Sequence, residues 1–581
     1  MTSPKVRDSM GAPTVTANIE QRRPAALARL AASPWPACGL LALAGGLRLI
    51  NLGGRPMWYD EAFAVLYAEK PLTTMLSGTL TQVRGAASDV HPLLYYSLLH
   101  AWMGLAGQSP LAVRALSALV GVMTVGVIYL LARRLFGHPA GLVAAGIVSL
   151  SPFHIYYSQE ARMYALLGLA GAALVYFFVR AWSQAGSWRS WFGFGMCGAL
   201  TLYAHNLGFA FVAGLDAWIA YAWLRRGRKC WRSLRPAVLA HLLMIALFAP
   251  WLVAVPAQFG KIQQAYWVAR PGLAELVQTA VIFHFAYDNQ SLPGWLLPPA
   301  LFVSLLVVAI LALHLARLAL RGALPSLAIN RQAERAKPAE AGSATETQDR
   351  AAPLLPTPYS LLLCTTGIPI LLLFAVSQWR PVYIVRALLP SGLMYAVLLA
   401  GVMVAGRVPK AVRWGLLVPS AAVCLAALLN HYGYAGFPRA PFDQAAAYLR
   451  AHSQPADAIV HGNKLTYFPT HVYDRSLPQT FIADEPGSPA DTLAYPTQDA
   501  LGLFAAPDLA SAVARHQRVW FVIFRRAVDE YRAAGYPDHP QLSWLDERYM
   551  RVSVASFNDL DVYQYEMKPA RAALRVPEAG R

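Results

Sequence analysis

The sequence predicts a polytopic, all-helical membrane domain followed by a small α/β domain, and three observations carry this prediction. The 581 residues are 56% hydrophobic and 14% charged, with a mean hydropathy of +0.38, which is too apolar for a soluble enzyme of this size. Several apolar runs reach the roughly 20 residues that a helix needs to cross a bilayer. After about residue 430 these runs end, and helix-like and strand-like patterns follow one another.

The net charge of +18 could indicate a nucleic-acid partner, but its distribution favours a lipid bilayer instead. Residues 1–430 carry 34 Lys and Arg against 14 Asp and Glu, whereas residues 431–581 carry 15 against 17. A basic excess in short loops is the signal that orients membrane proteins. The five cysteines lie in or beside apolar segments and show neither a disulfide framework nor a zinc spacing. We therefore predict a membrane environment and no nucleic acid.

The basic residues also set the predicted orientation. Residues 1–33 are polar, carry several arginines and lack a small-residue cleavage site, which predicts a disordered cytoplasmic leader and an uncleaved first helix. With these arginines in the cytoplasm, the chain emerges outside the inner or plasma membrane after the first apolar segment, residues 36–52.

The membrane domain, residues 34–430, is predicted to have about eleven spans. They cover about 36–52, 113–131, 140–151 with flanking residues, 164–182, two segments flanking 205–206, and then 240–256, 296–320, 357–378, 384–405 and 412–430.

The first external loop, about residues 53–112, contains a shorter apolar run. At about 14 residues, the run 91–105 suits an interfacial or re-entrant helix better than a span. Counting it as a span would place Arg133 and Arg134 outside, against the positive-inside rule.

Two further regions complete the predicted organisation. Residues 321–356, rich in Ala, Glu, Arg and Thr, predict a flexible cytoplasmic linker. Residues 431–568 predict a small external α/β domain, and residues 569–581 a disordered tail. Within the α/β domain we expect a helix over 442–451 and strands over 458–461, 519–524, 552–557 and 562–565.

Acidic residues on the predicted outer side are the candidate catalytic groups. Asp60 and Glu61 follow the first span, and adjacent carboxylates there are costly unless solvated, paired or used. Glu160 lies at the outer end of a later span. Two carboxylates that converge on one cavity suit general-base or metal-assisted transfer. Taken alone, the first pair is equally consistent with a solvated loop.

Cationic side chains on the same predicted side are candidate phosphate ligands, because arginine binds phosphate bidentately. They are His91, Arg162, His205, Arg380 and Arg386. Structural roles remain open for some, since His205 could cap a helix and Arg380 could anchor to lipid headgroups. Asp216 lies in the middle of a predicted span and needs a partner that the sequence does not identify.

Four motifs in the first 170 residues carry a family resemblance. They are Trp58-Tyr59-Asp60-Glu61, His91-Pro92 before Leu-Leu-Tyr-Tyr, Arg133 to Gly137, and Ser151 to Tyr164. This pattern resembles that of GT-C glycosyltransferases, in particular the bacterial relatives of protein O-mannosyltransferases and of the lipid A aminoarabinose transferase. The similarity covers about residues 36–400, and residues 442–449 with 454–457 also resemble the start of such a tail domain. The sequence departs from the family pattern at two positions. It has Leu93 where the family often has a second proline, and Glu160 where many members have an aspartate.

The resemblance implies a polyprenyl-phosphate-linked hexose or pentose donor, an acceptor outside the membrane (lipid, glycan or protein) and transfer with inversion. It maps the catalytic acids onto Asp60 and Glu160. The donor phosphate and sugar are expected to contact Glu61, His91, Arg162, Tyr164, His205, Arg380, Tyr383 and Arg386.

Asp60 is the expected general base, because it matches the motif position. Neighbouring side chains on a helix or turn point in different directions, so only one of Asp60 and Glu61 can face the reacting centre. Glu61 would then orient loop groups. Glu160 would position the acceptor or a divalent cation such as Mg²⁺ or Mn²⁺.

Two other classes of function compete with this interpretation. A transporter would have ionisable groups or broken helices near the midplane and weakly repeated halves. Asp216 is the only acid at a predicted midplane, and no repeat is visible. A catalytically inactive receptor or scaffold is the third class.

Overall fold

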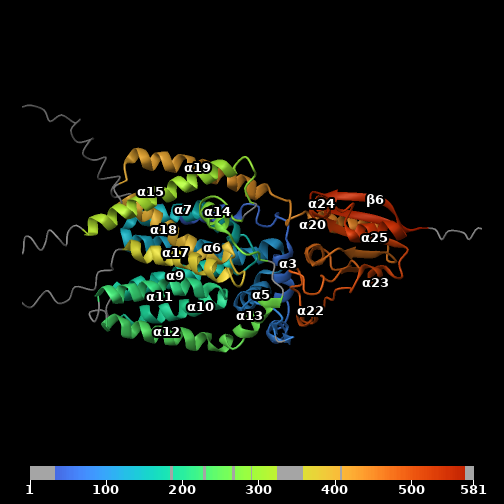
Figure 1. Cartoon of the computed structure of the whole chain (residues 1–581), viewed down its shortest axis with the longest axis horizontal. Helices are drawn as coiled ribbons and strands as arrows, with labels where there is room; N and C mark the ends of the chain where they lie inside the picture. Colours follow the sequence, from blue (N-terminus) through green and yellow to red (C-terminus); the bar gives the residue numbers. More distant parts are fainter. Residues whose placement is uncertain are drawn as a thin grey trace, which may run out of the picture.

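The computed structural model describes residues 33–84, 86–183, 187–226, 231–264, 268–288, 291–323, 358–405 and 408–568. A long helical bundle carries at one end a smaller domain built on a β-sheet (Figure 1). This arrangement confirms the predicted all-helical membrane domain with a C-terminal α/β domain. The predicted leader, nearly all of the linker and the tail 569–581 lie outside the described residues.

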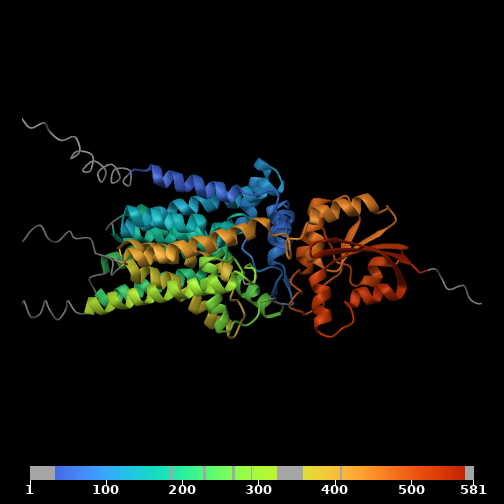
Figure 2. The ribbon, with the colours of Figure 1, turned by 90° about the horizontal axis from the view of Figure 1, so that it is seen from above.

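Each predicted span corresponds to a helix within the described residues. These helices lie side by side along the long axis of the molecule (Figures 1 and 2). They are α2 (Trp35–Leu49), α6 (Pro110–Phe136), α7 (His138–Leu150), α9 (Tyr164–Ser183), α10 (Trp188–Ala204), α11 (Gly208–Arg226), α12 (Trp231–Leu252), α15 (Leu297–Ala323), α17 (Pro358–Ser377), α18 (Leu389–Ala405) and α19 (Lys410–Gly433).

The chain is a multi-pass membrane protein. In the described residues, seven helices are long and apolar enough to cross a bilayer, or eight if α7 and α8 (Pro152–Ser158), which meet at 63°, form one broken span. Helix α2 and residues 208–224 of α11 are apolar but shorter. The count of eleven spans therefore stays a prediction.

Close packing in the bundle places the ends of two helices beside each other. Helix α18 packs against α9, and the short 3₁₀ helix η2 (Val385–Leu388) leads into it. A Cβ on Gly171 would lie 2.7 Å from the Cβ of Pro390, so glycine is needed for this approach. As a result, the segment that carries Arg386 lies next to the start of α9 at Tyr164.

Helices of the loops that the sequence predicts to be external lie between the bundle and the C-terminal domain. Among them are α3 (Tyr59–Ala68), α5 (Leu94–Ala106) and α13 (Val255–Gln264) (Figure 1). Helix α5 has 13 residues, which agrees with the short helix predicted in this loop. Asp60 and Glu61 lie in the first turn of α3, where carboxylates interact favourably with the helix dipole. Two further helices, α4 (Leu72–Leu80) and α14 (Leu273–His284), and the two-residue strands β1 (Gln82–Val83) and β2 (Ala86–Ala87) complete these loops.

The C-terminal domain contains a five-stranded mixed sheet with strand order β4-β3-β5-β7-β6. Strand β3 pairs in parallel with β4 and β5, and the other pairs are antiparallel. Apolar clusters pack against the sheet. As a result, β3 and β5 are buried along almost their whole length. The strands are β3 (Ala458–His461), β4 (Gln479–Phe481), β5 (Arg518–Phe524), β6 (Tyr549–Phe557) and β7 (Leu560–Met567). The helices are α20 (Phe442–His452), α21 (Lys464–Tyr473), α22 (Tyr495–Leu501), α23 (Leu509–Val513), α24 (Arg525–Ala533) and α25 (Pro540–Arg548).

The C-terminal domain is fixed to the loop helices by a shared core. The ring of Phe468 in α21 meets Tyr59 in α3 edge to face at 5.4 Å. Thr497 donates a hydrogen bond to the carbonyl oxygen of Gly78 in α4 at 2.8 Å. A Cβ on Gly78 would lie 2.5 Å from the Cβ of Ala500, so α4 and α22 approach this closely only with glycine. The domain therefore lies directly against the helix that carries Asp60.

The structure identifies the partner of Asp216. His241 of α12 places Nε2 2.8 Å from Oδ1 of Asp216 in α11. The two residues therefore satisfy each other between two helices of the bundle.

The orientation of the protein can be tested by cysteine labelling. In a cysteine-free background, a membrane-impermeant maleimide should label Asp529→Cys, on the exposed surface of α24, in intact cells. Glu340→Cys should react only after permeabilisation, because the distribution of basic residues predicts a cytoplasmic position for it. The reverse pattern would contradict the predicted external position of the candidate site.

Candidate active site

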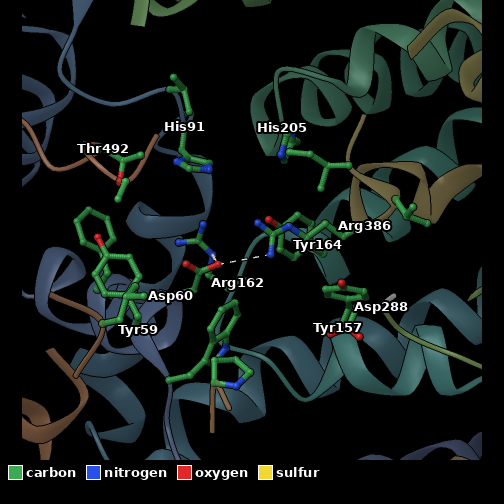
Figure 3. Close-up of a pocket in the computed structure, with 18 of the residues that line it drawn as sticks. Tyr59, Asp60, His91, Tyr157, Arg162, Tyr164, His205, Asp288, Arg386 and Thr492 are labelled. Carbon is green, nitrogen blue, oxygen red and sulfur yellow. Dashed lines mark ion pairs between the residues drawn. The ribbon is translucent and has the colours of Figure 1, made fainter. Parts of the chain in front are cut away.

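A cavity of about 700 Å³ opens where the bundle, the loop helices and the C-terminal domain meet. Polar, charged and aromatic side chains line it together (Figure 3). Seven of the ten predicted site residues are among them: Asp60, His91, Arg162, Tyr164, His205, Tyr383 and Arg386. Residues from five distant parts of the sequence therefore converge on one space.

Asp60 lies between two arginines in this cavity. Its Oδ2 is 3.8 Å from Nε of Arg162 and 3.7 Å from Nη1 of Arg386 (Figure 3). These distances are those of ion pairs rather than of direct hydrogen bonds. The carboxylate is 16% exposed, so it is held by charge at the cavity surface and can still accept a proton from a bound group.

The two arginines are themselves held by aromatic residues. Arg162, in the loop before α9, donates a hydrogen bond to the hydroxyl of Tyr96 at 3.1 Å. The guanidinium of Arg386 lies 5.2 Å from the ring centre of Tyr164. Cations over aromatic faces are stabilised without losing their hydrogen-bonding edges. Both groups are therefore positioned to bind an anion beside Asp60.

Two histidines complete this side of the cavity. His91 is 2.8 Å from Asp89, and its ring centre is 6.2 Å from that of His205. Burial, together with His91, Arg386 and Arg162, lowers the pKa of His205 well below its ordinary value, so this ring is neutral at neutral pH. Its Nδ1 accepts a hydrogen bond from the backbone N–H of Leu207, which leaves the proton on Nε2. His205 is thus a neutral hydrogen-bond donor.

Glu61 faces away from the cavity. It is fully buried and is not among the lining residues. Arg114 binds both of its oxygens at 2.7 and 2.8 Å, and Arg439 binds Oε2 at 2.7 Å. Burial alone would raise the pKa of Glu61, but these two guanidiniums hold it well below its ordinary range. The structure therefore provides no contact between Glu61 and a donor in the cavity.

Glu160 and Arg380 also lie outside the cavity lining. Glu160 is buried and accepts hydrogen bonds from the indole of Trp58 at 2.8 Å and from Arg439 at 3.4 Å. Burial raises the pKa of Glu160 to about 7, against the opposing effect of Arg439. Arg380 is exposed in the turn before η2. Tyr383, which does line the cavity, shares a hydrogen bond of 2.7 Å with Thr279.

Among the residues that the structure describes, the two predicted acids do not form a site for Mg²⁺ or Mn²⁺. Asp60 is paired with two guanidiniums, and Glu160 is occupied by Trp58 and Arg439. Across the described parts of the chain, no group of three or more His, Cys, Asp or Glu side chains is close enough to hold a metal ion. Magnesium usually needs several oxygen ligands in octahedral geometry.

The sequence did not predict that the C-terminal domain contributes to the cavity. Asn463, Lys464, Asp484 and Thr492 line it, as does Arg439 from the segment between α19 and α20. No local motif marks these residues, because they reach the cavity only through the packing of α21 and α22 on the loop helices. The only sequence feature that pointed to this domain was the resemblance of its first residues to the start of other tail domains.

Comparisons with known proteins agree with this architecture. A family model described as dolichyl-phosphate-mannose-protein mannosyltransferase matches residues 90–253. A sequence comparison with curated proteins gives no match. The crystal structure of ArnT from Cupriavidus metallidurans in the apo state is similar at a TM-score of 0.56 and 16% identity, over 92% of this chain and 98% of that chain. The structure of that protein bound to undecaprenyl phosphate matches at a TM-score of 0.51, with the same identity and coverage. The chain therefore has a fold similar to that of ArnT, and residues 90–253 match the mannosyltransferase family model.

Proposed function

We propose that this protein is a membrane glycosyltransferase that transfers a sugar from a polyprenyl-phosphate donor to an extracytoplasmic acceptor. The observation that carries the proposal is the position of Asp60 between Arg162 and Arg386, in a cavity at the end of the membrane bundle. A carboxylate beside an anion site is the arrangement that proton removal and departure of a phosphate both require.

The donor phosphate is proposed to bind at the arginine side of the cavity. Arg386 lies where η2 enters α18, so a lipid chain in the bilayer and its phosphate could reach it together. Arg162 supplies a second guanidinium, and neutral His205 a hydrogen-bond donor. The structure of similar fold that is bound to undecaprenyl phosphate supports a polyprenyl phosphate as the lipid carrier.

The proposed reaction is a single displacement at the anomeric carbon. The acceptor hydroxyl forms a bond to this carbon while Asp60 takes its proton, and the bond to the phosphate oxygen breaks. The leaving polyprenyl phosphate keeps the electron pair, and the two arginines stabilise the charge that develops there. Attack opposite the leaving group inverts the configuration. Glu160, behind Trp58 and Arg439, then supports the site from outside the cavity rather than touching the sugar.

Binding of undecaprenyl phosphate tests the phosphate site without knowledge of the sugar. Arg386→Ala should weaken binding by roughly 10–100-fold, since hydrogen bonds to charged groups contribute about 1.5–3 kcal/mol. Arg386→Lys keeps the positive charge but loses the planar guanidinium fork. Its affinity for undecaprenyl phosphate should therefore lie between that of the parent protein and that of Arg386→Ala. Native mass spectrometry of the purified protein would measure these affinities.

Arg380→Ala is the matched control for this prediction. Arg380 is six positions earlier and exposed outside the cavity, so its removal should leave the affinity unchanged. Equal affinities for the parent protein and Arg386→Ala would place the phosphate elsewhere and assign Arg386 to headgroup anchoring.

The function itself is tested by mass spectrometry of envelope lipids and glycans from cells with and without this protein. If the protein is a glycosyltransferase, cells that contain it should carry a product with one sugar more than the acceptor. Cells without the protein should accumulate the polyprenyl-phosphate sugar. A transporter would move a solute without forming a new glycosidic bond.

A further inference from the structure

An ionisable pair of the membrane bundle lies outside the cavity lining. Asp216 is near the middle of α11, and His241, near the middle of α12, places Nε2 2.8 Å from its Oδ1. Helix α12 is long and apolar enough to cross a bilayer, and both helices run along one edge of the bundle (Figure 1). Ionisable side chains inside a membrane are costly and usually mark a function. The proposed transfer reaction does not use this pair.

The geometry shows that the pair holds one shared proton. Nδ1 of His241 is 2.7 Å from the carbonyl oxygen of Ala237, so this nitrogen is a donor. The contact of Nε2 with Oδ1 of Asp216 then joins either a neutral imidazole to a protonated carboxyl group or an imidazolium to a carboxylate. Both forms are neutral overall, which suits an apolar environment. In both forms the second oxygen of Asp216, Oδ2, is a hydrogen-bond acceptor.

The bundle covers Asp216 only in part. The side chain of Asp216 is 46% exposed, and that of His241 is 25% exposed. The imidazole packs against the ring of Phe194 in α10, with the ring centres 5.1 Å apart. Hydrocarbon contains no hydrogen-bond donor, so an acceptor at a lipid-facing surface costs free energy. Asp216 therefore favours a neighbour that brings a donor to its depth in the membrane.

The surface around Asp216 allows another helix to approach closely. Ala213 is half-buried and Ala220 is exposed, and they lie on the same face of α11 as Asp216, three positions before it and four after it. Leu242 follows His241 on α12 and is 55% exposed. Small side chains let the backbones of membrane helices come close together, and polar side chains form hydrogen bonds across such contacts. We call these five residues the Asp216 face.

We propose that the Asp216 face is a docking site for a transmembrane helix of another protein, and that this helix presents an amide, hydroxyl or ammonium donor to Asp216. Complementarity to the acceptor oxygen selects this occupant. A lipid tail brings no donor. A second copy that met this one about a twofold axis at Asp216 would bring two acceptor oxygens together. The inference does not depend on the proposed function.

A designed helix tests the site without knowledge of the natural partner. The two probes are a leucine-only transmembrane peptide and the same peptide with one central asparagine, added below saturation to phosphatidylcholine vesicles that contain the full-length protein. A photo-crosslinking amino acid in place of Leu242 reports binding. The asparagine peptide should crosslink roughly 3–30-fold more than the leucine peptide, which is the effect of one polar contact between membrane helices.

Two variants locate the contact on the protein. Asp216→Leu removes the acceptor, so the two peptides should crosslink equally. Ala220→Leu leaves the ionisable pair intact and fills the exposed face beside it, so it should lower the yield of the asparagine peptide without changing the melting temperature. Leu425→Ala is the control, because Leu425 is 61% exposed on α19, and this variant should keep the preference for asparagine.

Three results would overturn the inference. The first is equal crosslinking of the two peptides to the parent protein. The second is a preference for asparagine that survives in both Asp216→Leu and Ala220→Leu. The third is an adduct in cells, formed from the same photo-crosslinking position, at twice the mass of the chain, which would assign the face to a second copy. None of these measurements uses undecaprenyl phosphate or an envelope product, so they stay distinct from the tests of the proposed function.

Discussion

Asp60→Asn is expected to lower sugar transfer by about 10²–10⁴-fold, the usual contribution of a general base. Asparagine has the size of aspartate but cannot take the proton of an acceptor hydroxyl. The ion pairs of Asp60 with Arg162 and Arg386 are long, at 3.8 and 3.7 Å, so the cavity should keep its shape without them. The rate of product formation in membranes and the affinity for undecaprenyl phosphate are the two measurements. The rate should fall and the affinity should stay close to that of the parent.

Two other variants make this prediction specific. Glu69→Gln changes a carboxylate at the end of the same helix, where it pairs with Arg475 outside the cavity, and should leave the rate unchanged. Glu160→Gln tests the other predicted acid. Near-normal turnover in Asp60→Asn with an inactive Glu160→Gln would move the base to Glu160. Activity in both would indicate an acceptor that is already an anion, such as a phosphate.

The helical segments could be predicted because their signal is local. A run such as residues 113–131 is apolar apart from Arg114 and a few small polar residues, and the structure extends it only to Pro110–Phe136. Strand β4 was missed, because three residues, Gln479–Phe481, carry too little pattern and form a strand only by pairing with β3. The number of helices that cross the membrane depends on the bilayer as well as on the chain, which is why it does not follow from the helix count.

The candidate site was predictable where a motif marked it and not where packing created it. Asp60, Arg162 and Arg386 were identified from loop motifs and from basic residues at span ends. Arg439 and Lys464 were not, because neither lies in a recognisable pattern. Both reach the site only because the C-terminal domain folds back onto α3 and α4.

The adjacent acids Asp60 and Glu61 show how helix geometry separates the surroundings of two neighbouring side chains. Successive residues of an α-helix point about 100° apart, so one acid can face the cavity while its neighbour faces the protein core. The motif predicts different roles for the two acids, and the family resemblance also implies that Glu61 contacts the donor. In the structure Asp60 lines the cavity, whereas Glu61 binds Arg114 of α6 and Arg439. We infer that Glu61 positions α3.

Arg439 makes this buried cluster the link between the two domains. It is 1% exposed and contacts Glu61 at 2.7 Å, Glu160 at 3.4 Å and the carbonyl oxygen of Pro56 at 3.0 Å. It lies just before α20, the first helix of the C-terminal domain. The cluster therefore fixes the C-terminal domain to the turn that carries Asp60.

Glu61→Gln should destabilise the protein by about 3–5 kcal/mol, because removal of one partner leaves buried charges without compensation. This corresponds to a fall in melting temperature of roughly 5–15 °C. Glu530→Gln removes a carboxylate from the exposed pair with Arg526 and should cost at most about 1 kcal/mol. Thermal unfolding of the purified variants in detergent would measure both effects. A Glu61→Gln protein that melts like the parent but no longer binds undecaprenyl phosphate would return Glu61 to the donor site. A protein that melts early, yet still binds the lipid below its melting temperature, would confirm that Glu61 holds α3 and the C-terminal domain in place.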